Sequence, residues 1–235
     1  MCVSSVHLEL TESRSSRPTP LKLVWFCTGS SDPTEQISAN ISALNFLRAL
    51  KGERITGEAT IPMAGKLRRL NNDNLDEAID WFGEMVANYF LRQSIPPPFF
   101  VVPIPDTNTT LESSAGPWTS LTAMAIASKF EGDAEALDVL RWKKGLSSLG
   151  IEAKDPARLC ENLAVLGRIA WDRPVVLVDY LADAARAQAC AAFLRAQGAR
   201  VLLCVLAGRI VPEKIQNHFG VFRVEISGIH PTLPG

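Results

Sequence analysis

The sequence predicts an α/β protein whose core is a doubly wound parallel sheet, preceded by an N-terminal lid or extension. Three observations lead to this fold class. Residues 174–206 contain an apolar strand, an alanine-rich helix and a second apolar strand, which is the order of a βαβ crossover. Residues 99–104 (FFVVPI) form a short apolar run typical of a buried strand. Along the rest of the chain, helical spacing alternates with such runs, which favours helices packed on a sheet.

The first hundred residues are predicted to form a lead-in, a strand and a helix. Residues 1–20 end in a polar stretch with two prolines and predict a flexible lead-in. Residues 21–27 (LKLVWFC) predict the first strand. From Thr34 onward the apolar residues recur every three or four positions and stop before Gly52, which predicts a helix. The apolar positions of this helix are Ile37, Ile41, Leu44, Leu47 and Leu50.

A short strand and a second helix follow. Residues 57–63 fit an edge strand, because Pro62 cannot donate a hydrogen bond to a ladder. Residues 74–91 have an apolar face at helical spacing and predict an amphipathic helix. The prolines at 96–98 end it, since each disfavours helix in the residue before it. Residues 21–98 are therefore interpreted as an N-terminal strand–helix part and candidate lid.

Residues 99–235 are interpreted as the core domain. A polar loop over residues 105–116 leads into a predicted helix over residues 117–130. Residues 136–142 fit either a strand or a helix, and residues 155–166 predict a helix. Residues 221–226 offer a last strand. In a doubly wound sheet the ligand site lies at the carboxyl ends of the strands, which draws attention to the turn after Val178.

Composition excludes several classes of protein. The net charge of −1 argues against a general nucleic-acid binder, because proteins that track phosphates carry a basic excess. The five cysteines form no C-x-x-C pair and the three histidines share no ligand-like spacing, so neither a redox motif nor a metal site is expected. The sequence has no apolar run near the ~20 residues of a membrane span and no signal peptide, so we expect a cytoplasmic protein.

Several short motifs occur in a recognisable order. Residues 102–105 read Val-Pro-Ile-Pro at the end of a predicted strand, and residues 140–144 (LRWKK) form a basic stretch. Arg158 and Asn162 stand four residues apart on a predicted helix. With the βαβ unit described above, residues 99–208 resemble the type I phosphoribosyltransferases, in particular their competence-protein-like branch.

The resemblance implies a specific site in the turn after the strand that ends at Asp179. In that family two acidic residues at this strand end hold the ribose hydroxyls, and a Thr-Thr-Gly turn binds the 5′-phosphate at the start of a helix. Here the acidic positions are Asp179 and Tyr180, and the Thr-Thr-Gly positions are Asp183, Ala184 and Ala185. One acid remains, whereas both hydroxyls and the glycine that lets backbone approach a phosphate are absent.

Asp183 is the largest departure from the family pattern. A carboxylate within ~4 Å of a phosphate costs on the order of 1 kcal/mol even in bulk water. Aspartate is also among the preferred residues at a helix N-cap, where its oxygen accepts hydrogen bonds from the first turn. We therefore predict that Asp183 caps the helix and takes the place of the phosphate. A cap without any ligand at this site is the alternative interpretation.

The other candidate site residues come from two segments. Asp106 and Thr107 follow the Val-Pro-Ile-Pro strand end, in a loop (residues 106–118) that contains no lysine or arginine. Its backbone N–H groups and threonines remain candidate ligand contacts. In the basic stretch, Arg141 and Lys144 are candidate phosphate contacts. Lys143 is a candidate catalytic residue together with Asp179. A solvated basic face is the alternative interpretation of this stretch.

Two classes of function follow, and a third hypothesis concerns assembly. The first is a phosphoribosyltransferase-fold protein with a degenerate donor loop, which binds a nucleotide, a phosphoribosyl ligand or a partner in a regulatory role with weak or lost transferase activity. The second is an active transferase that moves phosphoribosyl from phosphoribosyl pyrophosphate to a base, with Mg²⁺ as its cofactor; no other cofactor is expected. The third is an obligate subunit of a homo- or hetero-oligomer.

Overall fold

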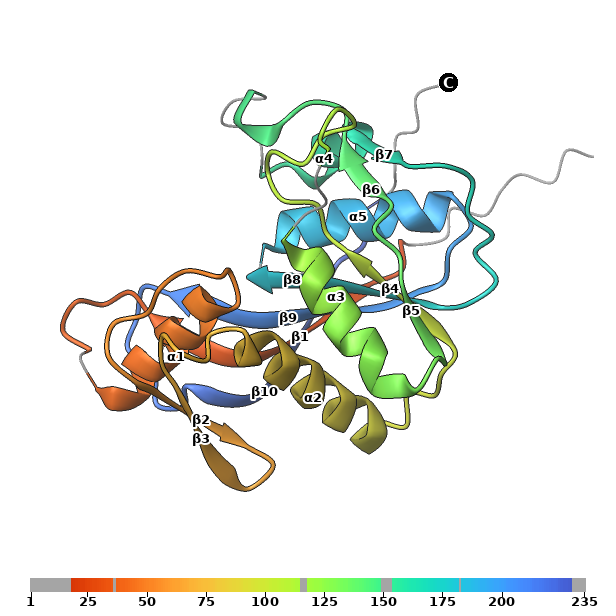
Figure 1. The fold of residues 1–235 in the computed structure, drawn as a ribbon. Coiled ribbons are helices and arrows are strands. Elements are labelled where there is room, and N and C mark those ends of the chain that lie inside the picture. Colours follow the sequence, from red (N-terminus) through yellow and green to blue (C-terminus); the bar gives the residue numbers. More distant parts are fainter. Residues whose placement is uncertain (1–17, 36, 115–117, 149–153, 182, 230–235) are drawn as a thin grey trace, which may run out of the picture.

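A six-stranded sheet forms the centre of the molecule (Figure 1). The computed structural model describes residues 18–35, 37–114, 118–148, 154–181 and 183–229. The predicted lead-in over residues 1–20 thus lies outside the described residues except for its last three. Across the sheet the strands follow the order β10-β1-β9-β8-β4-β5. Their bounds are β1 Leu21–Ser30, β4 Phe99–Pro103, β5 Ala134–Ala136, β8 Val175–Leu181, β9 Val201–Val211 and β10 Phe219–Ile226.

The sheet is mostly parallel, with one antiparallel edge. Strands β1, β9, β8, β4 and β5 run parallel to their neighbours, whereas β10 pairs with β1 in the antiparallel direction. The predicted parallel sheet is thus a mixed, mostly parallel one, because β10 runs antiparallel to β1. The connection from Val211 to Phe219 contains no crossover helix, so β10 begins at the same end of the sheet at which β9 finishes. Strand β10 therefore runs in the opposite direction to β9 and β1.

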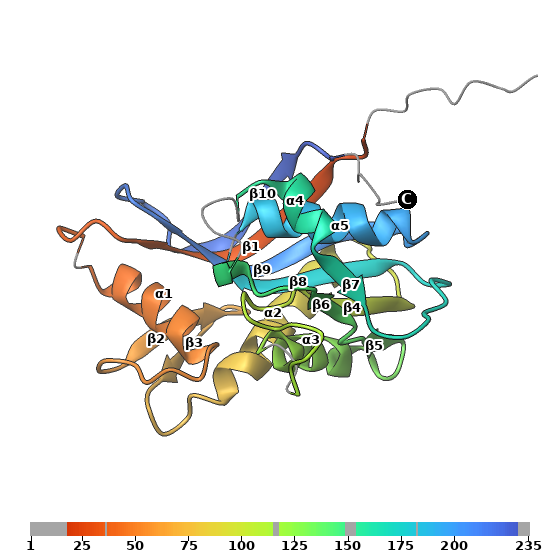
Figure 2. The same cartoon turned by 90° about the horizontal axis from the view of Figure 1, so that it is seen from above.

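Helices cover both faces of this sheet, as the view in Figure 2 shows. One face packs against α1 (Ser38–Ala49), α2 (Glu77–Arg92) and α3 (Thr119–Ala127), and the other against α4 (Pro156–Glu161) and α5 (Ala184–Ala196). The apolar side chains of each strand alternate between these two cores. Val101 and Val176 face the first core, whereas Val102 and Leu177 face the second. An α/β protein with a mostly parallel sheet is thereby confirmed.

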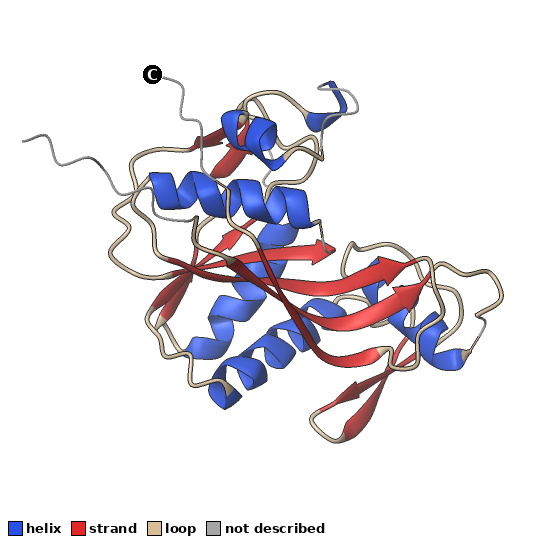
Figure 3. Ribbon diagram, turned by 180° about the vertical axis from the view of Figure 1, so that it is seen from behind, coloured by secondary structure: helices blue, strands red, loops and turns tan. Residues whose placement is uncertain are grey.

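The neighbours β4 and β8 mark the point where the chain changes direction across the sheet. From β4 the chain passes through α3 to β5 on one side, and from β8 it passes through α5 to β9 on the other side. The two crossover helices lie on opposite faces, which Figure 3 shows from behind. Such a switch point leaves a crevice outside the carboxyl ends of the two strands, and this crevice is where open α/β sheets bind ligands.

The N-terminal part is joined closely to the sheet. Strand β1 lies inside the sheet between β10 and β9, and α1, α2 and the hairpin of β2 (Ala59–Met63) and β3 (Lys66–Leu70) follow it in the chain. The predicted edge strand is thus confirmed as β2, in a hairpin of its own. On α1 the predicted apolar face was partly wrong, because Ile37 and Ile41 are 50% and 43% exposed.

A polar contact explains how α1 is turned. Asn40 is buried, and its side-chain amide accepts a hydrogen bond from the Ser30 backbone N at 2.7 Å and donates to the Ser30 carbonyl at 3.2 Å. This pair fixes the first turn of the helix against the end of β1. The residues that face the sheet are then Ala43, Phe46 and Leu47.

The predicted helix over residues 155–166 is shorter in the structure. It ends at Glu161, and the chain continues into β7 (Leu163–Val165), which pairs antiparallel with β6 (Leu140–Trp142). Asn162 causes the change, because its side chain accepts from Lys144 N at 3.0 Å and donates to Lys144 O at 2.7 Å. Of the ambiguous residues 136–142, residue 136 ends β5, residues 140–142 form β6, and residues 137–139 connect the two strands. Short 3₁₀ turns lie at Ser128–Phe130 and Leu146–Ser148.

No helix in the described part of the chain is long and apolar enough to cross a membrane.

Candidate functional site

Several of the predicted site residues lie where β4 and β8 end, which is the place where open α/β sheets bind ligands. Asp106 follows the end of β4, and Asp179 and Tyr180 lie near the end of β8. Asp183 and α5 come directly after β8. Asp179 is completely buried, and Tyr180 is half-buried. The charges of Asp106 and Asp183 both act on Asp179.

Asp183 caps α5, as the sequence predicts. Its backbone is extended, and its Oδ1 accepts hydrogen bonds from the backbone N of Ala185 at 3.1 Å and of Arg186 at 3.2 Å. These N–H groups have no partner inside the helix, so the carboxylate satisfies donors that an anion would otherwise bind. The first turn of α5 is thus occupied by the chain's own negative group.

Arg186 is the residue that sequence reasoning missed. Its side chain is 8% exposed, and its guanidinium lies between two carboxylates. Nη2 lies 2.9 Å from Asp179 Oδ2, and Nε donates to Asp183 Oδ2 at 3.1 Å. The spacing of three residues from Asp183 was a signal for the second contact. The first contact depends on how β8 and α5 meet, which no local pattern shows.

Burial has the largest effect on the titration of Asp179. It raises the pKa of Asp179 to about 6, against the opposing effects of Arg186 and of the hydrogen bond from the Tyr180 backbone N at 2.8 Å. Asp179 Oδ2 has no aligned hydrogen bond among the described residues, so its contact with Arg186 is a close ion pair rather than a hydrogen bond. For Arg186, burial acts to lower the pKa, but the two carboxylates raise it above the usual value.

The loop after β4 is held by contacts to the N-terminal part. Asp106 Oδ2 accepts from the Trp118 backbone N at 2.7 Å, and the Trp118 indole N–H donates to the Leu50 carbonyl. Beside it, the Lys51 ammonium lies 4.6 Å from the centroid of the Tyr180 ring. The end of α1 therefore lies beside the loop after β4 and the end of β8, and Asp106 is already engaged within the loop.

The remaining candidates are engaged elsewhere or are exposed. Arg141 is buried, and its Nη1 lies 2.5 Å from Asp138 Oδ1 and donates to the Leu140 carbonyl at 2.8 Å, so its charge is neutralised internally. Lys143 is exposed, and its Nζ donates to the Glu161 carbonyl at 2.7 Å. The side chains of Lys144, Thr107 and Ala184 are exposed, and Ala185 is half-buried.

Trp142, in the basic stretch, is a core residue. It is completely buried, and its indole N–H donates to the Asp106 carbonyl at 3.0 Å. Among the described residues no group of three or more His, Cys, Asp or Glu side chains could hold a metal ion. The role of Mg²⁺ therefore stays a prediction tied to the active-transferase alternative.

A second polar cluster lies at the carboxyl end of β1. Glu35 and His218 are both buried, with His218 Nε2 3.3 Å from Glu35 Oε1. His218 Nδ1 lies 3.0 Å from the Thr28 carbonyl oxygen, and Glu35 accepts from the Ile215 backbone N at 3.3 Å. Each contact joins the connection between β9 and β10 to β1 or the segment after it. The cluster thus holds the connection between β9 and β10 against the end of β1, next to which β10 pairs.

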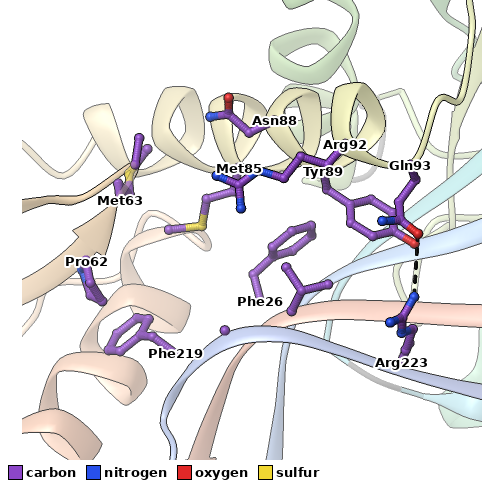
Figure 4. Close-up of a pocket in the computed structure, with 13 residues that line it drawn as sticks. Phe26, Pro62, Met63, Met85, Asn88, Tyr89, Arg92, Gln93, Phe219 and Arg223 are labelled. Atoms are coloured by element: carbon purple, nitrogen blue, oxygen red, sulfur yellow. Dashed lines mark hydrogen bonds between the residues drawn. The ribbon is translucent and has the colours of Figure 1, made fainter.

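A cavity of about 370 Å³ lies on a different part of the molecule (Figure 4). It is bounded by α2, the β2–β3 hairpin, β1 and β10. Its lining residues are Phe26, Pro62, Met63, Ala64, Met85, Asn88, Tyr89, Arg92, Gln93, Phe219, Gly220, Val221 and Arg223. These residues come from distant parts of the sequence, and no motif in the sequence indicated this cavity.

Comparison with known proteins adds no relative: no family model matches the chain, and no curated protein matches it. The function must therefore be inferred from the chain's own residues. Two regions have residues that indicate a function: the turn between β8 and α5, and the cavity beside α2.

Proposed function

We propose that this chain is a phosphoribosyltransferase-like protein whose phosphate-binding turn is closed by its own side chains, and that it acts as a partner-binding or regulatory protein with weak or lost transferase activity. The observation that carries the proposal is the set of contacts of Asp183. Its carboxylate accepts from two of the free N–H groups at the start of α5, those of Ala185 and Arg186, and it binds the Arg186 side chain as well.

The arrangement of the core supports the resemblance on which this proposal depends. The Val-Pro-Ile-Pro segment ends β4, and Asp179 lies near the end of β8, so both motifs meet at the switch point of the sheet. The unit β8–α5–β9 is a parallel crossover between neighbouring strands. A phosphoribosyl ligand of a protein with this fold would bind at the same crevice.

The electrostatics of the crevice oppose a phosphate. An incoming phosphate would compete with Asp183 for the N–H groups of Ala185 and Arg186. It would also approach the charges of Asp106, Asp179 and Asp183, while the guanidinium of Arg186 is already shared by two of them. Each like charge at 4 Å costs about 1 kcal/mol in water and about 4 kcal/mol at an effective dielectric constant of 20.

Titration calorimetry with phosphoribosyl pyrophosphate, with and without Mg²⁺, tests the proposal. We expect no binding by the natural chain up to millimolar ligand. Micromolar binding that Asp179→Ala abolishes would overturn the proposal and favour the active transferase.

A reopened variant serves as the matched control. It combines Asp183→Thr, Ala184→Thr and Ala185→Gly, which restores the Thr-Thr-Gly pattern of the family. We expect this variant to bind the ligand, because hydroxyl and N–H donors then replace the carboxylate at the helix start. Circular dichroism checks that the variant is folded. A folded reopened variant that binds nothing would show that closure by Asp183 is not what prevents binding.

A further inference from the structure

We infer that the cavity beside α2 is a binding site for a small amphiphilic anion, a molecule with an apolar body and a carboxylate or similar group at one end. None of the lining residues belongs to β4, β8 or α5, so this inference is independent of the function proposed for the crevice. The volume of about 370 Å³ falls within the range of about 300 to 1,000 Å³ that is typical of small-molecule sites.

The apolar end of the cavity is formed by side chains from three elements and the start of β10. In Figure 4, Met63 and Pro62 of β2 and Phe219 of β10 lie together, with Met85 of α2 and Phe26 of β1 between them and the other end. Met63 is 4% exposed and Phe26 5% exposed, and both belong to the hydrophobic core, so the floor of this end is built from core side chains. Methionine side chains adapt to ligands of different shape, because they have three rotatable bonds.

The charged groups of the cavity are both positive. Arg92 and Arg223 line it, and none of its lining residues is acidic. Among the described residues Arg92 forms no ion pair, and Arg223 Nη1 donates only to Gln93 Oε1, at 3.5 Å. A guanidinium prefers a carboxylate, which it binds through two parallel hydrogen bonds. The charge of the cavity therefore favours an anion over a neutral or cationic ligand.

Tyr89 marks where the polar end of the ligand would lie. Its side chain is 3% exposed, and its hydroxyl has no hydrogen-bond partner among the described residues. Figure 4 shows its ring extending from α2 toward Gln93 and Arg223. A buried hydroxyl normally has a partner. The polar groups of Tyr89, Gln93 and Arg223 thus lie at one end of the cavity, and Met63 and Phe219 lie at the other. The anionic group of the ligand would bind at the first end and its apolar body at the second.

Calorimetry with two probes of equal length tests the inference. Decanoate carries an apolar chain and one carboxylate, whereas decan-1-ol has the same chain without the charge. We expect decanoate to bind the full chain with one site per molecule, at least tenfold more tightly than decan-1-ol, since a hydrogen bond to a charged group is lost with the alcohol. Equal affinities, or no binding of decanoate below millimolar concentration, would overturn the inference.

Three variants locate the binding. Replacing both cavity arginines, Arg92→Gln with Arg223→Gln, should weaken decanoate binding by roughly tenfold or more and leave decan-1-ol unchanged. Filling the cavity with Met85→Trp should weaken both probes. The exposed Arg200, which precedes β9 and does not line the cavity, provides the control variant Arg200→Gln, which should bind as the natural chain does. Loss of affinity in the control equal to that of the arginine pair would place the anion elsewhere and contradict the inference.

Discussion

The turn between β8 and α5 and the cavity beside α2 both hold arginine side chains, but in opposite states. Arg186 is 8% exposed and lies between the carboxylates of Asp179 and Asp183. Arg92 and Arg223 are exposed, and no acidic residue lines the cavity with them. This difference determines where an anion can bind. At the turn the protein supplies the anion itself, whereas at the cavity the positive charge remains available to a ligand.

This contrast has a physical basis in burial. Removing charges from water is costly, so the buried guanidinium of Arg186 requires partners inside the protein. Exposed guanidinium groups stay hydrated in the folded protein, so they need no internal partner, and they lose this hydration only when a ligand binds. The closed turn should therefore matter for stability, and the cavity arginines for binding alone.

Removing Arg186 should have the largest effect on stability. Arg186→Met leaves Asp179 and Asp183 without their shared partner, and we expect the free energy of unfolding in urea at pH 7 to fall by about 4 kcal/mol. Adding Asp179→Leu should recover part of this loss, because an apolar pair replaces an unpaired buried charge. A loss below about 1 kcal/mol would contradict a structural role for the ion pair.

Asp179 should make the protein less stable as pH rises. Its pKa is raised from 3.8 to about 6 in the folded state. Below pH 3.8 the group is protonated in both states, and between pH 3.8 and about 6 it ionises in the unfolded state first. Stability should fall across this window by about 3 kcal/mol.

The variant Asp179→Asn isolates this contribution. Urea unfolding of the natural chain and of the variant, at intervals from pH 4 to pH 7, should show a shallower decline in the variant. The exposed Asp73 provides a control, since Asp73→Asn should keep the slope of the natural chain. Identical slopes for the natural chain and Asp179→Asn would rule out a raised pKa at this carboxyl.

The cap of α5 should contribute more than the cap of α4. Asp183→Ala removes two hydrogen bonds to the helix start and one partner of a buried guanidinium, and we expect a loss of about 2 kcal/mol. Asp155 caps α4 through Ala157 N, and its arginine neighbour Arg158 is exposed. Asp155→Ala should therefore cost about 1 kcal/mol or less in urea unfolding. Equal losses would mean that Arg186 adds nothing to the α5 cap.

The cavity arginines should contribute least to stability. Arg92→Gln and Arg223→Gln should each change the free energy of unfolding by no more than about 0.5 kcal/mol, because both side chains are exposed and have no acidic partner among the described residues. Thermal unfolding of the two variants beside the natural chain measures this. A destabilisation comparable to that of Arg186→Met would remove the distinction between the two regions.

The sequence predicted features that depend on local patterns. The strand–helix–strand unit around α5 follows from apolar runs and helical spacing, and the Asp183 cap follows from residue preference at one position. The buried strand β4 was predicted in the same way, from a short apolar run.

Features set by distant contacts were beyond local reasoning. Asp179 meets Arg186 only because β8 and α5 join at a particular angle. The direction of β10 depends on a connection without a crossover helix, and the early end of α4 depends on the side chain of Asn162. The cavity draws its lining from β1, β2, α2 and β10, so no single segment carried its signal.

Occupation of the helix start by Asp183 is the central claim, and amide NMR measures it directly. The backbone N–H groups of Ala185 and Arg186 donate to Asp183 Oδ1. In a titration of the ¹⁵N-labelled chain with phosphoribosyl pyrophosphate and Mg²⁺, we predict that both amide signals keep their positions up to millimolar ligand. A saturable shift of these two signals at micromolar ligand would mean that the phosphate displaces Asp183, and it would contradict the claim that the turn is closed.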